Sequence, residues 1–406
     1  MRRDKNMDKK QEIQDEVQLI QDLFDGIDNG DFNNFGETSD KYTFKYLKAI
    51  WDLQTVLDGG KELYKQIYEI AIKCGIRHVQ QKYKTGRKIK VAFLTISAAE
   101  WPAESVYRLL KMNENVEAYL VVGPLIDRSV ENMEDAFEKT ASFFEKRGYD
   151  VRRAYDSKNK KVRLWEEIGK PDIVIHLTHW YKSLPEEYQI ENYPFTILNC
   201  YIPYAMSLAD NAKGTFMINS SNNSMFLNMM WHIYTDTMYH YEGYREYQLL
   251  GGENVVFTGF PKMDFFYNKI ENTSDQLMLM ANWKYPTGCD PKNMKKVIIA
   301  PHHTFLGYGG ILYSTFQWNM YFWIYLAKKY ENQISFIFKP HPNLRTRAIE
   351  AEVFRDAGDY ERYIDLWEKL PNARVSAEES YLEIFATSDG MIMDSNSFLA
   401  EYMYVN

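Results

Sequence analysis

The sequence predicts an α/β protein made of two doubly wound domains preceded by a helical segment. Short apolar runs alternate with helical stretches twice along the chain, first from Lys88 and again after Pro261. Continuous apolar runs are typical of parallel strands buried on both faces, and the intervening helices cover such a sheet. A chain of 406 residues is also too long for one ordinary core. We therefore expect a helical appendage over 1–87, a first domain over 88–261 and a second domain over 262–406.

The N-terminal appendage is expected to be helical because its apolar residues recur at three- and four-residue steps. This spacing runs from Ile13 to Phe24 and again from Leu63 to Cys74. Neither stretch gathers residues that suggest chemistry, so the sequence assigns the appendage no part in a reaction.

The first domain is expected to begin with a buried strand at 88–96, where charged residues lead into the run Val-Ala-Phe-Leu. The next helix should start near Pro102, because proline suits the first turn of a helix. The same reasoning gives helices at 102–112 and 129–147, and further strands at 116–122, 151–153, 171–177, 195–200 and 254–258.

The second domain repeats this alternation. Its expected strands are 297–301, 334–339, 373–375 and 390–393, and its expected helices are 315–330, 360–370, 381–387 and 397–404. We expect two Rossmann-like domains that face one another across a cleft, with ligands outside the carboxyl ends of the strands. A doubly wound domain normally continues beyond such a last helix, so we also expect that its C-terminal end is missing from this sequence.

Composition and charge narrow the range of functions. The net charge is −8 and the pI is near 5.6, which gives no general affinity for nucleic acid. Cys74, Cys200 and Cys289 lie far apart without disulfide or metal-ligand spacing, as expected in a reducing cytosol. No apolar run reaches the ~18–20 residues of a membrane span, and the charged N-terminus lacks the apolar region of a secretion signal. We expect a cytoplasmic protein, with any membrane contact peripheral and at the inner face.

Aromatic residues are abundant, at 16% of the chain. Large aromatic cores explain this excess best, because such side chains bury large areas wherever they occur. The alternative is that some form stacking platforms for a base or a sugar. We interpret Trp101, Trp180, Trp231 and Trp283 as packing residues.

Candidate chemistry gathers in three loops of the second domain, each directly after an expected strand. The loops are Ala300-Pro-His302-His303-Thr, Lys339-Pro-His341-Pro and Asp394-Ser395-Asn396-Ser397. Because the carboxyl ends of parallel strands meet at one edge of a sheet, these loops should converge there.

The third loop suits a phosphate. Ser395, Asn396 and Ser397 are good N-cap residues, and the unpaired N–H groups of a helix N-terminus favour an anion. The alternative is that this segment only caps a helix.

In the second loop, two prolines hold the backbone extended around His341. Lys339 and His341 would share a strand face if the strand extends that far. A cationic lysine and an imidazole suit a diphosphate and its leaving phosphate, and histidine can donate a proton near neutral pH. A purely structural loop histidine is the alternative.

The adjacent pair His302 and His303 raises the question of a metal site. Side chains of adjacent residues are expected to diverge, and no third ligand is suitably spaced, so we predict no metal. At least one of the two is expected to face the cleft. His176 and His179, which follow a first-domain strand, could line it too, or be buried and hydrogen-bonded.

An ordered set of segments gives a resemblance to a known family. The segments are Gly259–Asp264, Ile298–Pro301, Lys339–Pro342, and Ser388–Ser397 with Glu401. Their order resembles the CDP-glycerol glycerophosphotransferase family, the enzymes of teichoic acid and related polyol-phosphate polymers, which have the glycosyltransferase-B fold. The resemblance covers roughly residues 88–406.

The resemblance implies roles for individual residues. His341 would contact the donor phosphates and assist the leaving group, and Lys339 and Asp394–Ser397 would surround the diphosphate. Glu401 would hydrogen-bond the ribose. Asp264 matches the acidic end of a motif at the domain junction. The implied donor is a substrate, so no cofactor is expected.

The sequence departs from the family at the expected general base. Teichoic acid polymerases carry Trp-His-Gly-Thr in the first domain, whereas the corresponding segment here, Asn199–Tyr204, contains no histidine. The base would then be His302, His303 or His179.

The expected reaction is transfer of a polyol phosphate from a CDP-activated donor to a hydroxyl of a polymer or lipid-linked acceptor, with release of CMP. One alternative is a glycosyltransferase or nucleotide-sugar epimerase of the same fold that uses a UDP-sugar. The other is a catalytically inactive nucleotide-binding or scaffold protein.

Overall fold

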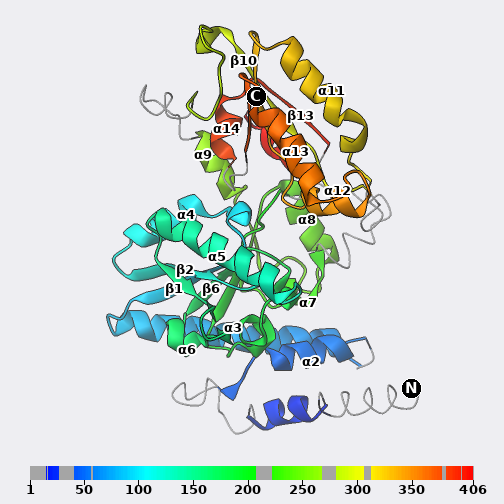
Figure 1. Ribbon diagram of the computed structural model, residues 1–406. Coiled ribbons are helices and arrows are strands. Elements are labelled where there is room, and N and C mark those ends of the chain that lie inside the picture. Colours follow the sequence, from blue (N-terminus) through cyan, green and yellow to red (C-terminus); the bar gives the residue numbers. More distant parts are fainter. Residues whose placement is uncertain are drawn as a thin grey trace, which may run out of the picture. The chain divides into compact units, whose positions relative to one another are not determined.

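The computed structural model describes residues 15, 17–26, 41–55, 58–206, 222–267, 280–305, 312–376, 381–394 and 396–405. The chain divides into two compact units, Met1–Lys262 and Met263–Asn406. Each unit has its own parallel sheet covered by helices on both faces, so the predicted α/β class is confirmed (Figure 1). Within the described residues, no helix is both long and apolar enough to cross a bilayer.

The first unit is built on a seven-stranded sheet in the order β3-β2-β1-β6-β7-β8-β9, and every adjacent pair is parallel. Its strands are β1 (Ile89–Thr95), β2 (Val116–Val122), β3 (Val151–Arg153), β6 (Ile173–His176), β7 (Leu198–Tyr201), β8 (His232–Thr235) and β9 (Val255–Phe257). A two-stranded hairpin, β4 (Tyr155–Asp156) with β5 (Lys161–Val162), lies outside this sheet.

The helices of the first unit cover the two faces of this sheet. They are α2 (Lys45–Leu53), α3 (Gly60–Lys84), α4 (Glu104–Met112), α5 (Val130–Lys146), α6 (Trp165–Ile168), α7 (Met225–Asn228) and α8 (Met238–Tyr247). Successive strand side chains point to opposite faces. Accordingly, Leu94 packs in the cluster that contains α2 and α3, whereas Phe93 packs in the cluster that contains α4 and α5.

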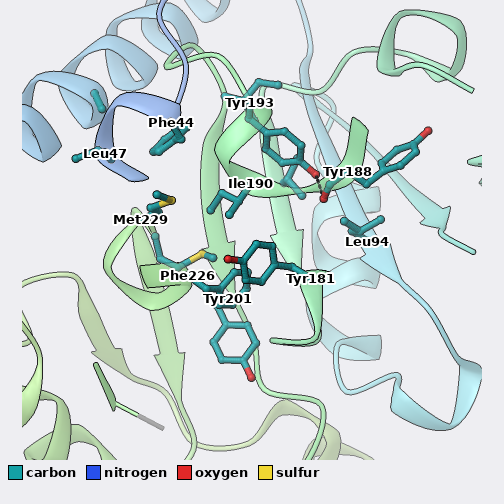
Figure 2. Packing of buried hydrophobic residues seen from close by; sticks show 14 of the residues in the cluster. Phe44, Leu47, Leu94, Tyr181, Tyr188, Ile190, Tyr193, Tyr201, Phe226 and Met229 are labelled. Atoms are coloured by element: carbon teal, nitrogen blue, oxygen red, sulfur yellow. Dashed lines mark hydrogen bonds between the residues drawn. The ribbon is translucent and has the colours of Figure 1, made fainter. Parts of the chain in front are cut away.

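Part of the segment expected as an appendage belongs to the core of the first unit. Phe44 and Leu47 are fully buried in one cluster with strand and loop residues such as Leu94 and Tyr193 (Figure 2). Tyr64 on α3 is fully buried in the same cluster. The backbone N–H of Phe44 also donates to the carbonyl of Tyr193 at 2.9 Å. Aromatic and aliphatic surface of α2 and α3 therefore closes one face of the sheet.

The second unit has a four-stranded parallel sheet in the order β12-β11-β10-β13. Its strands are β10 (Lys295–Ala300), β11 (Ile334–Phe338), β12 (Ala373–Val375) and β13 (Gly390–Met393). Its helices are α9 (Asp264–Tyr267), α11 (Phe316–Lys329), α12 (Leu344–Glu350), α13 (Ala357–Glu368), α14 (Leu382–Thr387) and α15 (Asn396–Met403). One hydrophobic cluster joins the sheet to α11, α12 and α13, and another joins it to α14 and α15.

Candidate functional site

The three loops singled out in the sequence lie at one edge of the second sheet. They follow β10, β11 and β13, and β10 pairs with both of the other strands in parallel. The loops are also tied together beyond the strands. The N–H of Lys339 donates to the carbonyl of Ile299 at 2.8 Å, and that of His341 to the carbonyl of Pro301 at 3.2 Å. The expected convergence of these loops is thus observed.

Three imidazoles form a cluster in these loops. The ring centre of His341 lies 4.0 Å from that of His303 and 5.0 Å from that of His302, and the rings of His302 and His303 are 4.3 Å apart. The expectation that the adjacent pair would diverge is wrong. That expectation assumed strand geometry, but β10 ends at Ala300 and the two histidines occupy a loop.

The cluster holds its histidines in the neutral form. Burial lowers the pKa of His341 to about 3 and that of His303 to about 4, and it also lowers the pKa of His302. The charges of the neighbouring imidazoles add to this effect, as does Lys339 for His341 and Arg347 for His303. Near neutral pH the site therefore offers uncharged imidazoles close to Lys339 and Arg347.

A hydrogen bond to His341 selects its tautomer. The backbone N–H of Asn343 donates to Nδ1 of His341 at 3.1 Å. A neutral imidazole whose Nδ1 accepts a hydrogen bond carries its proton on Nε2. His341 is thus prepared to donate from Nε2–H to an oxygen atom. For His302, Nδ1 lies 2.9 Å from the hydroxyl of Thr304, and either tautomer satisfies that contact.

The cluster also bears on metal binding. His302, His303 and His341 offer ligand atoms that all lie within 4.8 Å of one another, so the fold brings a third imidazole to the pair although it is distant in the chain. Ligation through Nε2 of His341 would require the proton to move to Nδ1, and Asn343 already donates there. The contacts of His341 therefore favour hydrogen-bond donation, and the absence of a resident metal stays a prediction.

Lys339 and His341 come together for a reason other than the expected one. β11 ends at Phe338, so the two residues do not share a strand face. Pro340 cannot continue a ladder because it has no N–H. The lysine is nonetheless close enough for its charge to lower the pKa of His341, and it is 9% exposed. The turn through Pro340 and the bonds to β10 bring the two together.

Asp394 organises the loops rather than presenting a free carboxylate. One carboxylate oxygen accepts the backbone N–H of His302. The other accepts the backbone N–H of Thr315 at 2.7 Å and its hydroxyl at 3.2 Å. Asp394 thus joins the end of β13 to the histidine loop and to the start of α11. The sequence analysis placed Asp394 among the phosphate-binding residues, and that role stays a prediction.

The other residues predicted to bind the nucleotide donor lie on α9 and α15 or outside the described residues. Asn396 and Ser397 form the first turn of α15, and Ser395 lies outside the described residues. Glu401 is buried, at 1% exposure, and accepts a hydrogen bond from the hydroxyl of Tyr381. Asp264 is exposed on α9 and makes no hydrogen bond to a described residue of the three loops. The ribose role of Glu401 therefore remains a prediction.

The first unit presents its own edge at the carboxyl ends of its strands. His176 ends β6, is buried, and lies 3.1 Å from the side-chain oxygen of Asn199. Burial lowers the pKa of His176 to about 4. It is therefore a satisfied core histidine. His179 lies further on, with Nδ1 3.5 Å from the hydroxyl of Tyr201.

Sequence reasoning gave no role to three residues around the histidine cluster. Thr304 contacts His302, Thr315 contacts Asp394, and Arg347 on α12 acts electrostatically on His303. Thr304 ends the first of the three loops and Thr315 begins the expected helix, so both lie in segments that the sequence analysis singled out. Nothing in the sequence marks Arg347, because its effect on His303 comes from the placement of α12.

Comparisons with known proteins add distant likenesses. No model of a protein family matches the chain, and no curated protein sequence matches it. The structure is similar to a UDP-GlcNAc 2-epimerase of Methanocaldococcus jannaschii, solved with UDP-GlcNAc and UDP, at 11% identity over 78% of this chain and 82% of that chain, with a TM-score of 0.41. It is also similar to the wall teichoic acid polymerase TagF, at 10% identity over 95% of this chain and 76% of that chain, with a TM-score of 0.43. The third example is S. aureus MnaA with UDP, at 13% identity, 77% and 75% coverage and a TM-score of 0.37. Likenesses this distant say nothing of what this chain binds.

Proposed function

We propose that this chain is a nucleotide-dependent transferase that moves a polyol phosphate from a CDP-activated donor to an acceptor hydroxyl and releases CMP. The observation that carries the proposal is the histidine cluster beside Lys339 and Arg347 at the carboxyl edge of the second sheet. Ligands of open α/β sheets bind at such an edge. The position of the reaction at the cytoplasmic face of a membrane belongs to the same proposal.

The cluster suits a diphosphate for electrostatic reasons. Lys339 and Arg347 place two positive charges near the imidazoles, while the carboxylate of Asp394 is engaged by three protein donors. The first turn of α15 follows Asp394 and adds backbone N–H groups, which favour an anion. Together these groups would stabilise the charge that develops on the leaving phosphate.

In the proposed step, the oxygen of the acceptor hydroxyl attacks the phosphorus that bears the polyol. A new P–O bond forms, the bond from that phosphorus to the bridging oxygen breaks, and CMP leaves with the bridging oxygen. Nε2–H of His341 would donate a hydrogen bond to the departing phosphate. The hydroxyl proton must pass to a base.

The direct test is CMP release from CDP-glycerol by the purified chain. His341→Gln is expected to lower kcat by about 10²–10³-fold, because it removes a donor aimed at developing charge. His78→Gln is the matched control, since His78 lies on α3 of the first unit and contacts Asp172. Equal activity of the His341 variant and the wild type would exclude His341 from the reaction.

A second candidate function is that of an enzyme that uses a UDP-sugar. The contacts proposed for the histidine cluster involve only the diphosphate, and a UDP-sugar carries the same group. A glycosyltransferase or nucleotide-sugar epimerase would therefore use the same residues. Thermal-shift measurements with CDP-glycerol, CDP-ribitol and UDP-sugars separate these, because a specific ligand stabilises the folded chain in proportion to ln(1 + [L]/Kd). CDP binding without turnover of any donor would indicate a nucleotide-binding protein.

A further inference from the structure

A basic pocket lies at the amino-terminal edge of the first sheet, opposite to the edge at which the strands end. Its volume is about 420 Å³, which is within the range of small-molecule sites. The lining comes from the end of α3 and from the loops before β1, β6 and β7, and it includes Lys82, Thr85, Arg87, Lys170, Asp172 and Thr196. All of these residues belong to the first unit, so the pocket is formed without the second unit.

The end of α3 determines where the cations of this pocket lie. Gly86 has a φ of 71°, the left-handed conformation that commonly follows a helix. Its N–H donates to the carbonyl of Tyr83 at 2.9 Å, and the N–H of Arg87 donates to the carbonyl of Lys82 at 3.1 Å. These bonds satisfy carbonyls at the negative end of the helix and hold the backbone of Arg87 just before β1.

The acidic residue in the lining, Asp172, is already engaged by the protein. It is 2% exposed, and its two carboxylate oxygens accept hydrogen bonds from Nζ of Lys82 at 2.8 and 2.6 Å. The backbone N–H of Lys90 donates to it at 2.7 Å. Burial alone would raise the pKa of Asp172, but these bonds and the contact with His78 hold it below its ordinary value. The carboxylate is therefore charged, and Lys82 compensates its charge.

Positive charge is in excess in and around the pocket. The lining contains three cations and one carboxylate, so Arg87 and Lys170 add to the charge that Lys82 compensates. Residues 73–90 contain seven lysines and arginines and no aspartate or glutamate, in a chain whose net charge is −8. A hollow surrounded by charges of one sign concentrates their field, which raises the local concentration of a ligand of opposite charge. The pocket therefore favours a compact anion.

The groups of the pocket match a phosphate carried on a small polyol. A guanidinium offers paired N–H groups to phosphate oxygens, and an ammonium adds a point charge. The hydroxyl of Thr85 donates to the carbonyl of Lys82 at 2.8 Å, so its oxygen is left to accept from a ligand hydroxyl. Gln81, Thr85 and Arg87 are exposed, so a ligand can reach them from solvent. The described lining contains no Phe, Tyr or Trp, and it thus gives a nucleobase no stacking partner.

We propose that this pocket binds a small phosphate monoester in solution, of the class of the sugar and polyol phosphates. The phosphate contacts Lys82, Arg87 and Lys170, and the carrier contacts the polar side chains at the end of α3. The bound ester is an effector that stabilises the first unit, and binding includes no covalent step. The proposal goes beyond the transfer reaction and does not depend on it.

The test is a calorimetric titration of the full chain with glucose 6-phosphate, glycerol 3-phosphate and inorganic phosphate. At least one of these probes should bind, and glucose should not. Arg87→Gln and Lys170→Gln should each weaken binding by about 10–100-fold, because a hydrogen bond to a charged group is lost. Lys84→Gln is the matched control, since Lys84 is exposed in the last turn of α3 and does not line the pocket. It should change the affinity by less than about threefold.

Hydrogen exchange gives an independent readout of where the ester binds. The ester should protect the amides of residues 81–90 and 170–173, and Arg87→Gln should remove this protection. Arg87 is exposed, so its substitution should leave the fold intact, which the melting temperature without ligand checks.

Four outcomes would overturn the inference. The first is that none of the three soluble probes binds at millimolar concentration. The second is equal weakening by Arg87→Gln and Lys84→Gln, which would indicate diffuse attraction to a basic surface. The third is binding that His341→Gln abolishes and Arg87→Gln preserves, which would place the phosphate at the histidine cluster. The fourth is binding to vesicles that contain phosphatidic acid without binding of a soluble ester, which would assign the pocket to a lipid headgroup.

Discussion

The three imidazoles of the histidine cluster are expected to influence one another's protonation. Each imidazole is partly buried and close to the others, so adding one proton makes the next less favourable. The same crowding prepares the site for an anion, because a bound negative charge relieves the repulsion. Donor binding and protonation should therefore be coupled.

We predict that CDP binding takes up protons. The free protein holds the pKa of His341 at about 3 and of His303 at about 4, and a bound diphosphate should raise both toward the ordinary value. Uptake should therefore be small near pH 7 and grow as the pH falls toward about 5.5. Calorimetry in two buffers of different ionisation enthalpy measures it. His341→Gln should reduce the uptake, and buffer-independent heats at pH ~6 would contradict the coupling.

Asp394 and Asp389 provide a matched pair at the two ends of β13. Asp394 joins β13 to the histidine loop, whereas Asp389 accepts the N–H of Lys296 at 2.8 Å at the other end. Either change to Asn should lower the free energy of unfolding by about 1–3 kcal/mol, since backbone N–H groups lose a charged acceptor. Only Asp394→Asn should also weaken CDP binding, by roughly tenfold or about 1.4 kcal/mol. Similar binding by both variants would remove the positioning role.

Among the elements, the strands with long apolar runs were the most predictable. The bounds of β2 agree with the sequence expectation, because burial leaves an apolar run over its last five residues. The bounds of β3 and β12 agree as well, although these edge strands contain arginines and are mostly half-buried. β8 and α8 were not predicted. β8 is only four residues long, contains His232 and Thr235, and alternates buried with half-buried positions. Parallel pairing with β7 and β9 sets the position of β8, and the residues of β8 alone do not predict this pairing.

Helix α11 offers a test of what burial contributes. Trp323 is 6% exposed and packs against the second sheet, whereas Trp318 on the same helix is 74% exposed. Trp323→Ala should lower the free energy of unfolding by about 3–5 kcal/mol, because it leaves a cavity. Trp318→Ala should change it by no more than about 0.5 kcal/mol. Urea denaturation measures both, and equal losses would contradict the assigned burial.

The two units have separate hydrophobic cores. The clusters of the first unit end at Val255, and those of the second begin at Trp283. Each core should therefore melt as its own cooperative transition. A ligand that binds to one unit should therefore shift the melting transition of that unit.

We predict that CDP shifts only the transition of the second unit. At a hundredfold excess over Kd the expected stabilisation is about 2.7 kcal/mol. Scanning calorimetry follows the two transitions, and hydrogen exchange should show protection in the loops after β10 and β11. Protection confined to the first unit would place the nucleotide at the other sheet and contradict the proposed donor site.

The α/β class, most strand positions and the three chemical loops follow from local patterns, because apolar runs, prolines and cap residues act on their immediate neighbours. The contacts between loops do not. The close approach of His341 to His303, the hydrogen bonds of Asp394 and the burial of Glu401 depend on residues far apart in the chain. Hydrogen bonding and desolvation depend on distance in space, so only the folded chain decides which polar groups are satisfied and which remain available to a substrate.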